Sequence, residues 1–160
     1  MASLTDDGDN LFAMAGAMGA ATSMGLGLAL ARPDKQVLVI TGDGELLMNV
    51  GSLATVAVHN PSNLSIVCVD NGHYGETGYQ QSHTSLGVNL ETIASGSGIA
   101  TTRTVAKKAD IADAAGLLGT GNGTSFVLLK VAPTDPPKVK RQMDSSAVRH
   151  RFRTALLGTP

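Results

Sequence analysis

The stretch that decides the fold is VLVITGDGELLMNVGSLATV, residues 37–56. Its opening VLVIT is apolar without alternation, which is typical of a strand buried on both faces of a parallel sheet. A Gly-Asp-Gly tripeptide at 42–44 interrupts this run, and residues 45–59 then place apolar side chains at helical spacing. The stretch therefore predicts a strand over 36–41, a tight turn with one carboxylate, and a helix over 45–59.

Strands and helices alternate along the rest of the chain. Further strands are expected over 64–70, 101–106 and 124–132, and further helices over the segment that ends before Pro33 and over 89–99, 108–119 and 145–158. This alternation predicts a single-domain α/β fold with three αβα layers and a parallel sheet. We divide the chain into a polar lead-in (1–10), the domain (11–135) and a tail with a short basic helix (136–160).

The composition limits the classes of partner. The chain has 160 residues, and its hydrophobic share of 42% is enough for a core. A net charge of -1 gives no electrostatic attraction to nucleic acid or to an anionic membrane. Aromatic residues make up 3% and Trp is absent, which argues against a surface on which bases stack. We therefore expect no nucleic-acid partner and no membrane partner.

The single cysteine and the N-terminal segments suggest a compartment. Cys68 lies inside an apolar run, which predicts a small core residue, gives no disulfide framework and favours a reducing, cytoplasmic location. Residues 1–10 are acidic, unlike the start of a cleavable signal peptide. Residues 11–31 are apolar and of about membrane length, but their glycines and Thr22 favour a buried loop and helix.

Asp43 and Asn71 each follow a predicted strand. Residues 45–70 between them are enough for one right-handed crossover, so both side chains are expected at the carboxyl edge of the sheet, where sites of open α/β folds lie. Carboxylate and amide oxygens suit Mg²⁺, and the helix expected from Glu45 would favour a bound anion. The tripeptide alone is more typical of a turn with an N-capping aspartate. Asn71 and the glycine-rich loop after it favour the metal site.

Two clusters of basic or titratable side chains are further candidates. The loop 71–87 is long, polar and glycine-rich, and loops of this kind are often functional. It contains His73 and His83, either of which is a candidate acid or base, with His83 preferred. A second group is the C-terminal cluster 149–153, with three arginines and His150, which could bind a sulfonate or phosphonate. Solvated side chains are the more common alternative for both groups.

Three motifs together resemble a known family. They are GAMGAATSMGLGLALA (16–31), the GDG tripeptide followed after residues 45–70 by Asn71-Gly72, and DNGHYGETGYQ (70–80). The set resembles the diphosphate-binding (PP) domain of thiamin-diphosphate enzymes over roughly residues 10–132. Within that family it is most similar to sulfopyruvate and phosphonopyruvate decarboxylases.

The resemblance implies a role for each matching residue. Asp43 and Asn71 would bind Mg²⁺ through their side chains and His73 through its backbone oxygen. The residues expected to contact the cofactor diphosphate through their backbone are Gly44, Glu45, Tyr74 and Gly75. Gly16 would accept a hydrogen bond from the aminopyrimidine through its carbonyl. Met18 would be the apolar residue wedged under the bent cofactor, although core packing is its ordinary role.

The resemblance also implies an activity and a partner. The chain is expected to be one subunit of a split, Mg²⁺-dependent 2-oxo acid decarboxylase that uses thiamin diphosphate. The glutamate that activates the cofactor lies in a separate pyrimidine-binding (PYR) domain, for which 160 residues leave no room, so a PYR-domain α subunit is expected in a hetero-oligomer. Alternatives are an acetolactate-synthase-like carboligase subunit, a nucleotide- or phosphate-binding module, and a scaffold without cofactor.

Two features depart from the family pattern. Asp70 stands where the broad family has asparagine, which the sulfopyruvate-type branch tolerates. The ten polar residues at the start cannot supply the additional strand and turn with which family PP domains begin. Either the chain is trimmed or its site is less enclosed than usual.

Overall fold

The computed structural model describes residues 1–135 and 139–158. The chain forms two compact units, one made of Gly19–Thr134 and the other of Met1–Met18 with Asp135–Pro160. Residues 136–138 and 159–160 of the predicted tail lie outside the described part.

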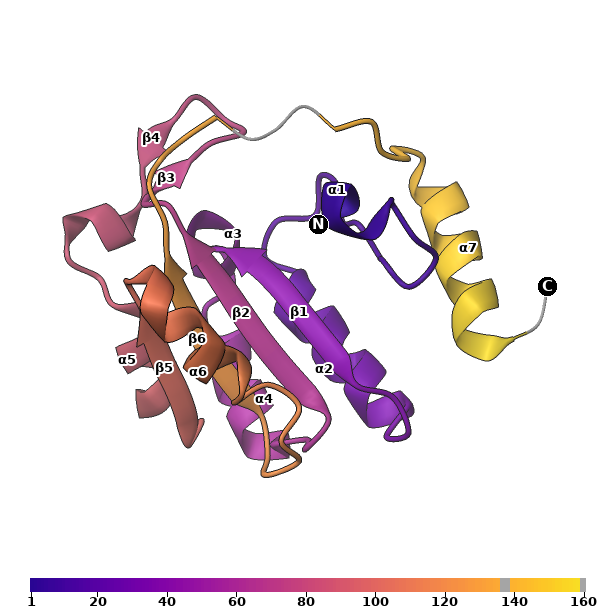
Figure 1. Cartoon of the computed structure of the whole chain (residues 1–160), viewed down its shortest axis with the longest axis horizontal. Helices are drawn as coiled ribbons and strands as arrows, with labels where there is room; N and C mark the ends of the chain where they lie inside the picture. Colours follow the sequence, from indigo (N-terminus) through magenta and orange to yellow (C-terminus); the bar gives the residue numbers. More distant parts are fainter. Residues whose placement is uncertain (136–138, 159–160) are drawn as a thin grey trace. The chain divides into compact units, whose positions relative to one another are not determined.

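A four-stranded parallel sheet forms the larger unit (Figure 1). Its strands, in spatial order, are β1 (Val37–Gly42), β2 (Leu64–Asp70), β6 (Ser125–Lys130) and β5 (Thr101–Val105). Every neighbouring pair is parallel. The predicted α/β fold with a parallel sheet is therefore confirmed.

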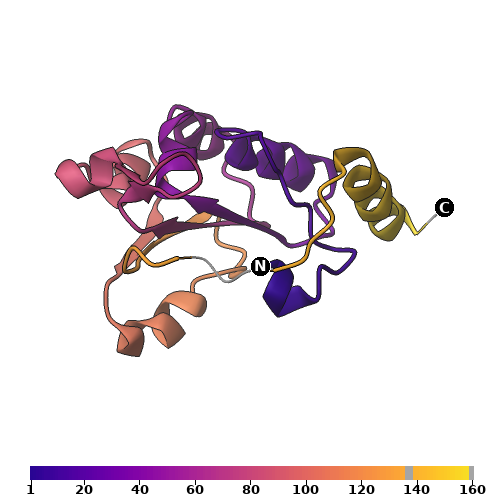
Figure 2. The same cartoon turned by 90° about the horizontal axis from the view of Figure 1, so that it is seen from above.

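Helices cover both faces of the sheet unequally (Figure 2). One face carries α2 (Ala21–Ala31), α4 (Ser52–His59) and α5 (Leu90–Gly96), and the other carries α6 (Ile111–Ala115). The main core lies between the sheet and the first group, whereas a smaller cluster built on Val105, Ala114 and Val127 lies under α6. The three predicted layers are present, but the α6 layer is small.

The uneven cover leaves β1 open on one face. The prediction that β1 is buried on both faces is wrong, because Leu38 is 52% exposed while Val37 and Val39 are buried. Leu38 shares its face with the cluster under α6, and that cluster reaches from β5 as far as Val67 on β2 but includes no residue of β1. Within the larger unit, this strand at the edge of the sheet is thus covered by helices on one side only.

The helix predicted over 45–59 is also wrong as a single element. It consists of α3 (Asp43–Leu47) and α4, and the chain turns between them through bonds from Met48 N to Glu45 O (3.2 Å) and from Asn49 N to Leu46 O (3.1 Å). The side-chain amide of Asn49 donates a hydrogen bond to the Gly19 carbonyl at 2.9 Å. This bond favours a break in the helix at this point. The spacing of apolar residues over 45–59 does not reveal this break, because α3 and α4 both bury leucines.

The loop 71–87 has structure of its own. Strands β3 (His73–Tyr74) and β4 (Gln80–Gln81) pair in an antiparallel hairpin, and a 3-10 helix follows over His83–Leu86.

The predicted helix over 108–119 is shorter than expected and consists of a 3-10 turn, Lys108–Asp110, followed by α6.

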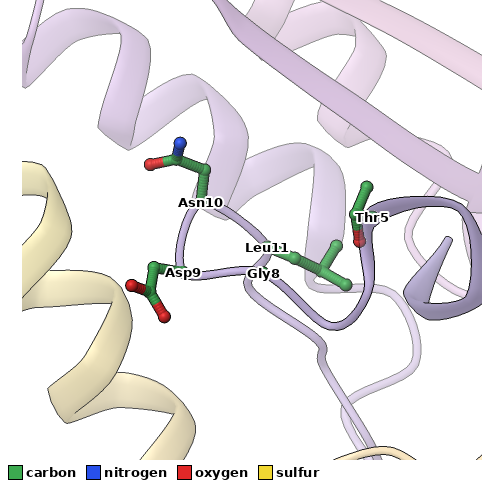
Figure 3. Close-up of a pocket in the computed structure, with 5 residues that line it drawn as sticks. All are labelled: Thr5, Gly8, Asp9, Asn10 and Leu11. Atoms are coloured by element: carbon green, nitrogen blue, oxygen red, sulfur yellow. The ribbon is translucent and has the colours of Figure 1, made fainter.

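The smaller unit is built on α1 (Ala2–Thr5) and α7 (Ser145–Leu157). The rings of Phe12 and Phe152 meet edge to face at 5.3 Å. Arg151 pairs with Asp7 at 3.3 Å, and this hydrogen-bonded partner lowers the pKa of the Asp7 carboxyl. A depression of about 250 Å³ in this unit is lined by Thr5, Gly8, Asp9, Asn10 and Leu11 (Figure 3). Among the described residues, no helix has the length and apolarity needed to span a membrane.

Helix α2 packs unusually closely on β1. A Cβ atom added to Gly25 would lie 2.1 Å from Cγ2 of Val39, whereas one added to Gly27 would meet nothing within 4 Å. Gly25 is therefore required by the close approach of helix and strand. Gly27 weakens the helix without any such compensation.

These two glycines give a matched pair of substitutions. Gly25→Ala should lower the free energy of unfolding by about 1–3 kcal/mol because the added methyl overpacks the α2–β1 contact. Gly27→Ala should raise it by about 0.4–1 kcal/mol because alanine restricts the unfolded chain and fits the helix. Urea unfolding followed by circular dichroism measures both, and equal effects of the two substitutions would contradict the close-packing account.

Candidate functional site

The carboxyl ends of β1 and β2 bring the predicted metal ligands to one edge of the sheet. Gly42 pairs with Val69 in the parallel register, so Asp43 and the Asp70-Asn71 pair leave adjacent strands at the same level. Asp43 is only 2% exposed although it begins the short helix α3. The structure thus brings Asp43 and Asn71 to the same edge, as the strand-end argument expects.

Two hydroxyl groups hold the Asp43 carboxylate. Ser82 Oγ donates a short hydrogen bond to Asp43 Oδ2, and Thr84 Oγ1 lies 3.2 Å from the same oxygen. Both side chains come from the return of loop 71–87 and neither is a candidate on sequence grounds. Because both hydroxyls bind Oδ2, Oδ1 is the oxygen of Asp43 that is available to a further ligand.

Asp70 has a cation partner. Lys130 Nζ lies 2.5 Å from Asp70 Oδ2, and the two residues are register partners on β2 and β6. The side chain of Asp70 is 1% exposed and that of Lys130 is 39% exposed. Among the described residues, Asp43 has no comparable cation within salt-bridge distance. A buried carboxylate of this kind favours a bound cation, because buried charges are normally paired or coordinate metals.

The Asn71 turn presents oxygen atoms at the same edge. Asn71 Oδ1 accepts a hydrogen bond from His73 N at 2.9 Å, and an amide oxygen has a second lone pair for another ligand. The His73 ring turns back on its own loop, with Nδ1 3.0 Å from Asn71 O and the ring 5.1 Å from that of Tyr79. A Cβ on Gly75 would lie 4.0 Å from Asn71 Nδ2, so the predicted Gly75 is also close.

Tyr74 covers the backbone of Gly44. A Cβ atom on Gly44 would lie 2.5 Å from two carbons of the Tyr74 ring. Two predicted diphosphate contacts, Gly44 and Tyr74, are therefore neighbours across the turn. Helix α3 has five residues, so its dipole favours an anion less than the long helix expected from the sequence would.

The side chain of Glu45 has a role that the sequence does not reveal. Its Oε1 accepts hydrogen bonds from Gly19 N (2.8 Å) and Ala21 N (3.1 Å), and Oε2 accepts one from Thr41 Oγ1. Glu45 therefore satisfies free amides at the start of α2, whose N-cap residue Ala20 has no side-chain acceptor. This contact fixes the beginning of α2 beside the Gly-Asp-Gly turn.

The remaining predicted residues are less constrained. Gly16, with φ of 74°, and Met18 belong to the smaller unit, so their cofactor contacts stay predictions. His83 is exposed at the start of the 3-10 helix, and its acid–base role also stays a prediction. In the cluster 149–153, Arg151 is paired with Asp7, which leaves fewer arginines for an anion.

Two other features adjoin the site. A depression of about 190 Å³ is lined by Asp70, Asn71, Gly72, Thr84, Ser85, Lys130 and Val131. Cys68 is fully buried on β2, and burial together with the charge of Asp43 raises the pKa of its thiol, so it is a packing residue as predicted. The described residues contain no group of three His, Cys, Asp or Glu side chains able to hold a metal. The candidate metal ligands are of another kind, because they combine one carboxylate with a side-chain amide oxygen and a backbone carbonyl oxygen.

The family model "Thiamine pyrophosphate enzyme, C-terminal TPP binding domain" matches residues 5–129. The chain belongs to this family. It is 52% identical over 98 residues to sulfopyruvate decarboxylase subunit beta of Methanocaldococcus jannaschii, which is 61% of this chain and 52% of that protein. It is 38% identical over 156 residues to phosphonopyruvate decarboxylase of Streptomyces viridochromogenes, which is 97% of this chain and 38% of that protein. The chain thus spans about half or less of the length of these two relatives.

The solved structures agree with the TPP-enzyme fold. The thiamine diphosphate-dependent 4-hydroxybenzoylformate decarboxylase of Rhodococcus jostii RHA1 superposes on 76% of this chain, and on 24% of its own length, with a TM-score of 0.59 and 22% identity. At this identity the likeness concerns the fold alone. The expected family membership is confirmed by the sequence match, and the roles of individual residues rest on the geometry described above.

Glu45 can be tested without any ligand. Glu45→Ala should lower the free energy of unfolding by about 1–3 kcal/mol because amides at the start of α2 lose a charged acceptor. Glu45→Gln keeps an acceptor oxygen and should lose less. The exposed Glu76 supplies the control, since Glu76→Ala removes no such contact. Chemical unfolding of the three variants measures this, and equal losses for Glu45→Ala and Glu76→Ala would exclude the capping role.

Proposed function

We propose that the chain is the PP-domain subunit of a split 2-oxo acid decarboxylase that depends on thiamin diphosphate and Mg²⁺. The observation that carries the proposal is the buried Asp43 carboxylate, which lies at a strand end beside Asn71 and lacks a cation partner among the described residues. Asp43 and Asn71 would bind Mg²⁺ by their side chains and His73 by its carbonyl oxygen. A divalent cation with oxygen ligands suits this donor set.

The diphosphate would lie between the Gly44 turn and the hairpin of loop 71–87. Gly44, Glu45, Tyr74 and Gly75 would contact it through their backbone, and the contact between Tyr74 and Gly44 holds the two segments together. Gly16 and Met18 would receive the pyrimidine end. When bound, thiamin diphosphate supplies the electron sink for loss of CO₂ from a 2-oxo acid.

The substrate would be a small 2-oxo acid with an anionic end. This class is suggested by the names of the relatives, which are sulfopyruvate and phosphonopyruvate decarboxylases. His83 is exposed beside Ser82, on the loop that bonds Asp43, and would exchange a proton with substrate. A carboligase of the acetolactate-synthase type is the second candidate, favoured by 40% identity over 67 residues to the large subunit of acetolactate synthase isozyme 1 of Escherichia coli.

A partner chain would complete the active site. The glutamate that activates the cofactor would come from the PYR domain of an α subunit in a hetero-oligomer. Support comes from the name of the relative in M. jannaschii, which is a beta subunit. The cytoplasmic location that we propose is supported by the lone buried Cys68, which gives this sequence no disulfide framework.

Asp43→Asn tests the metal site directly. Calorimetric titration of thiamin diphosphate should show binding to the full chain, co-expressed with its candidate partner, only when Mg²⁺ is present. The substitution should weaken this binding by at least the roughly 10–100-fold typical of losing a supporting contact. Asp113→Asn, on the exposed side of α6, is the control. Undiminished binding by Asp43→Asn, or stabilisation by NAD instead, would refute the proposal.

The split site makes a separate prediction. The chain alone, supplied with a 2-oxo acid, thiamin diphosphate and Mg²⁺, should release almost no CO₂, because the activating glutamate is missing. Adding the partner should restore turnover in a coupled decarboxylase assay. Robust turnover by the isolated chain would exclude a split enzyme.

A further inference from the structure

Thr84 stands between the two buried carboxylates of the site. Its Oγ1 lies 2.7 Å from Asp70 Oδ1 and 3.2 Å from Asp43 Oδ2. A hydroxyl group has one proton to donate, so Thr84 Oγ1 shares it between the two carboxylates in a three-centre bond whose shorter arm goes to Asp70. Ser82 Oγ donates a second hydrogen bond to Asp43 Oδ2, and this Oγ lies 2.9 Å from Thr84 Oγ1.

The contacts form one chain of hydrogen bonds across three elements. It runs from Lys130 on β6 to Asp70 at the end of β2, and from there through Thr84 to Asp43 after β1, where Ser82 is a second donor. Like charges that approach this closely repel each other, and each carboxylate here is held by a separate donor. The orientation of Asp43 therefore depends on Thr84 and Ser82.

The same short segment also holds the Asn71 turn. Ser82 N donates to the Gly72 carbonyl at 2.8 Å, and Ser85 Oγ donates to the same oxygen at 2.6 Å. Gly72 has a φ of 72°, and a Cβ there would lie 2.3 Å from Ser85 Oγ, so this backbone approach requires glycine. Residues 82–85 are thus bonded both to Asp43 and to the residue that follows Asn71.

We propose that Thr84, together with Ser82, is a positioning residue that sets the Asp43 carboxylate for a divalent cation. The inference rests on the proposed function, because the cation is the one that Asp43 and Asn71 would bind. Thr84 does not contact the cation itself. Together with Ser82, it keeps Oδ2 of Asp43 hydrogen-bonded and leaves Oδ1 of Asp43 free for the cation. It also holds the loop that carries Asn71 against the end of β1. Contacts of this kind around a metal site typically change metal affinity by about 10–100-fold.

The test uses Thr84→Val, which replaces the hydroxyl by a methyl group of similar size. Thr102→Val is the matched control, because Thr102 Oγ1 also donates to a carboxylate, that of Glu91, at 2.5 Å on another part of the sheet. Mn²⁺ replaces Mg²⁺ as a paramagnetic probe. Its affinity is measured by water-proton relaxation with thiamin diphosphate present, in the full chain co-expressed with its partner and without any assay of turnover.

The expected result is metal binding about 10-fold weaker in Thr84→Val, unchanged in Thr102→Val and close to wild type in Thr84→Ser, which keeps the hydroxyl. Ser82→Ala should weaken binding in the same way and supplies the test if Thr84→Val does not fold. A Thr84→Val variant that binds Mn²⁺ as tightly as wild type would overturn the inference. Failure of the wild-type complex to bind Mn²⁺ would instead refute the proposed function, so the two failures are distinguishable.

Discussion

The parallel register of β1 and β2 is the constraint on which the candidate site depends. Pairing of Gly42 with Val69 places Asp43 and Asp70 at one edge, where both are almost fully buried. Burying two carboxylates side by side is costly unless each is paired or hydrogen-bonded. Lys130 offsets this cost for Asp70, whereas in the described part of the chain Asp43 is held by the hydroxyls of Ser82 and Thr84 and by no cation. The remaining charge on Asp43 is what makes the edge suitable for a metal ion.

The sequence predicts those parts of the fold and site that follow from a local pattern. Continuous apolar runs identify β1 and β2, and the strand-end rule then brings Asp43 and Asn71 together, because parallel strands end at the same edge. The sequence does not reveal the open face of β1, because that face depends on how far α6 reaches across the sheet, which no local pattern records. The break in the helix predicted over 45–59 depends on a bond from Asn49 to Gly19, thirty residues earlier in the chain.

Some of the residues that support the site follow from a pattern in the sequence, and others do not. Lys130 ends β6, next to β2, so the strand-end rule applied to this strand would have included it. The strand-end rule does not identify Ser82 and Thr84, because they reach Asp43 only after loop 71–87 folds back through the β3–β4 hairpin. The capping role of Glu45 is hidden for a similar reason, since the amide donors at the start of α2 find their acceptor on a residue that follows β1.

The register also gives a physical account of Asp70, which departs from the asparagine of the broad family. Asp70 faces Lys130 directly across β2 and β6, so the additional negative charge meets a cation from the neighbouring strand. A neutral residue at position 130 would leave a buried carboxylate beside Asp43, and both would then attract a divalent ion. With Lys130 in place, Asp70 is bonded to lysine, to Thr84 and to Gly72 N, and its oxygens are not free to compete with those of Asp43. The departure at position 70 is therefore compatible with a metal site centred on Asp43, because its charge is balanced within the sheet.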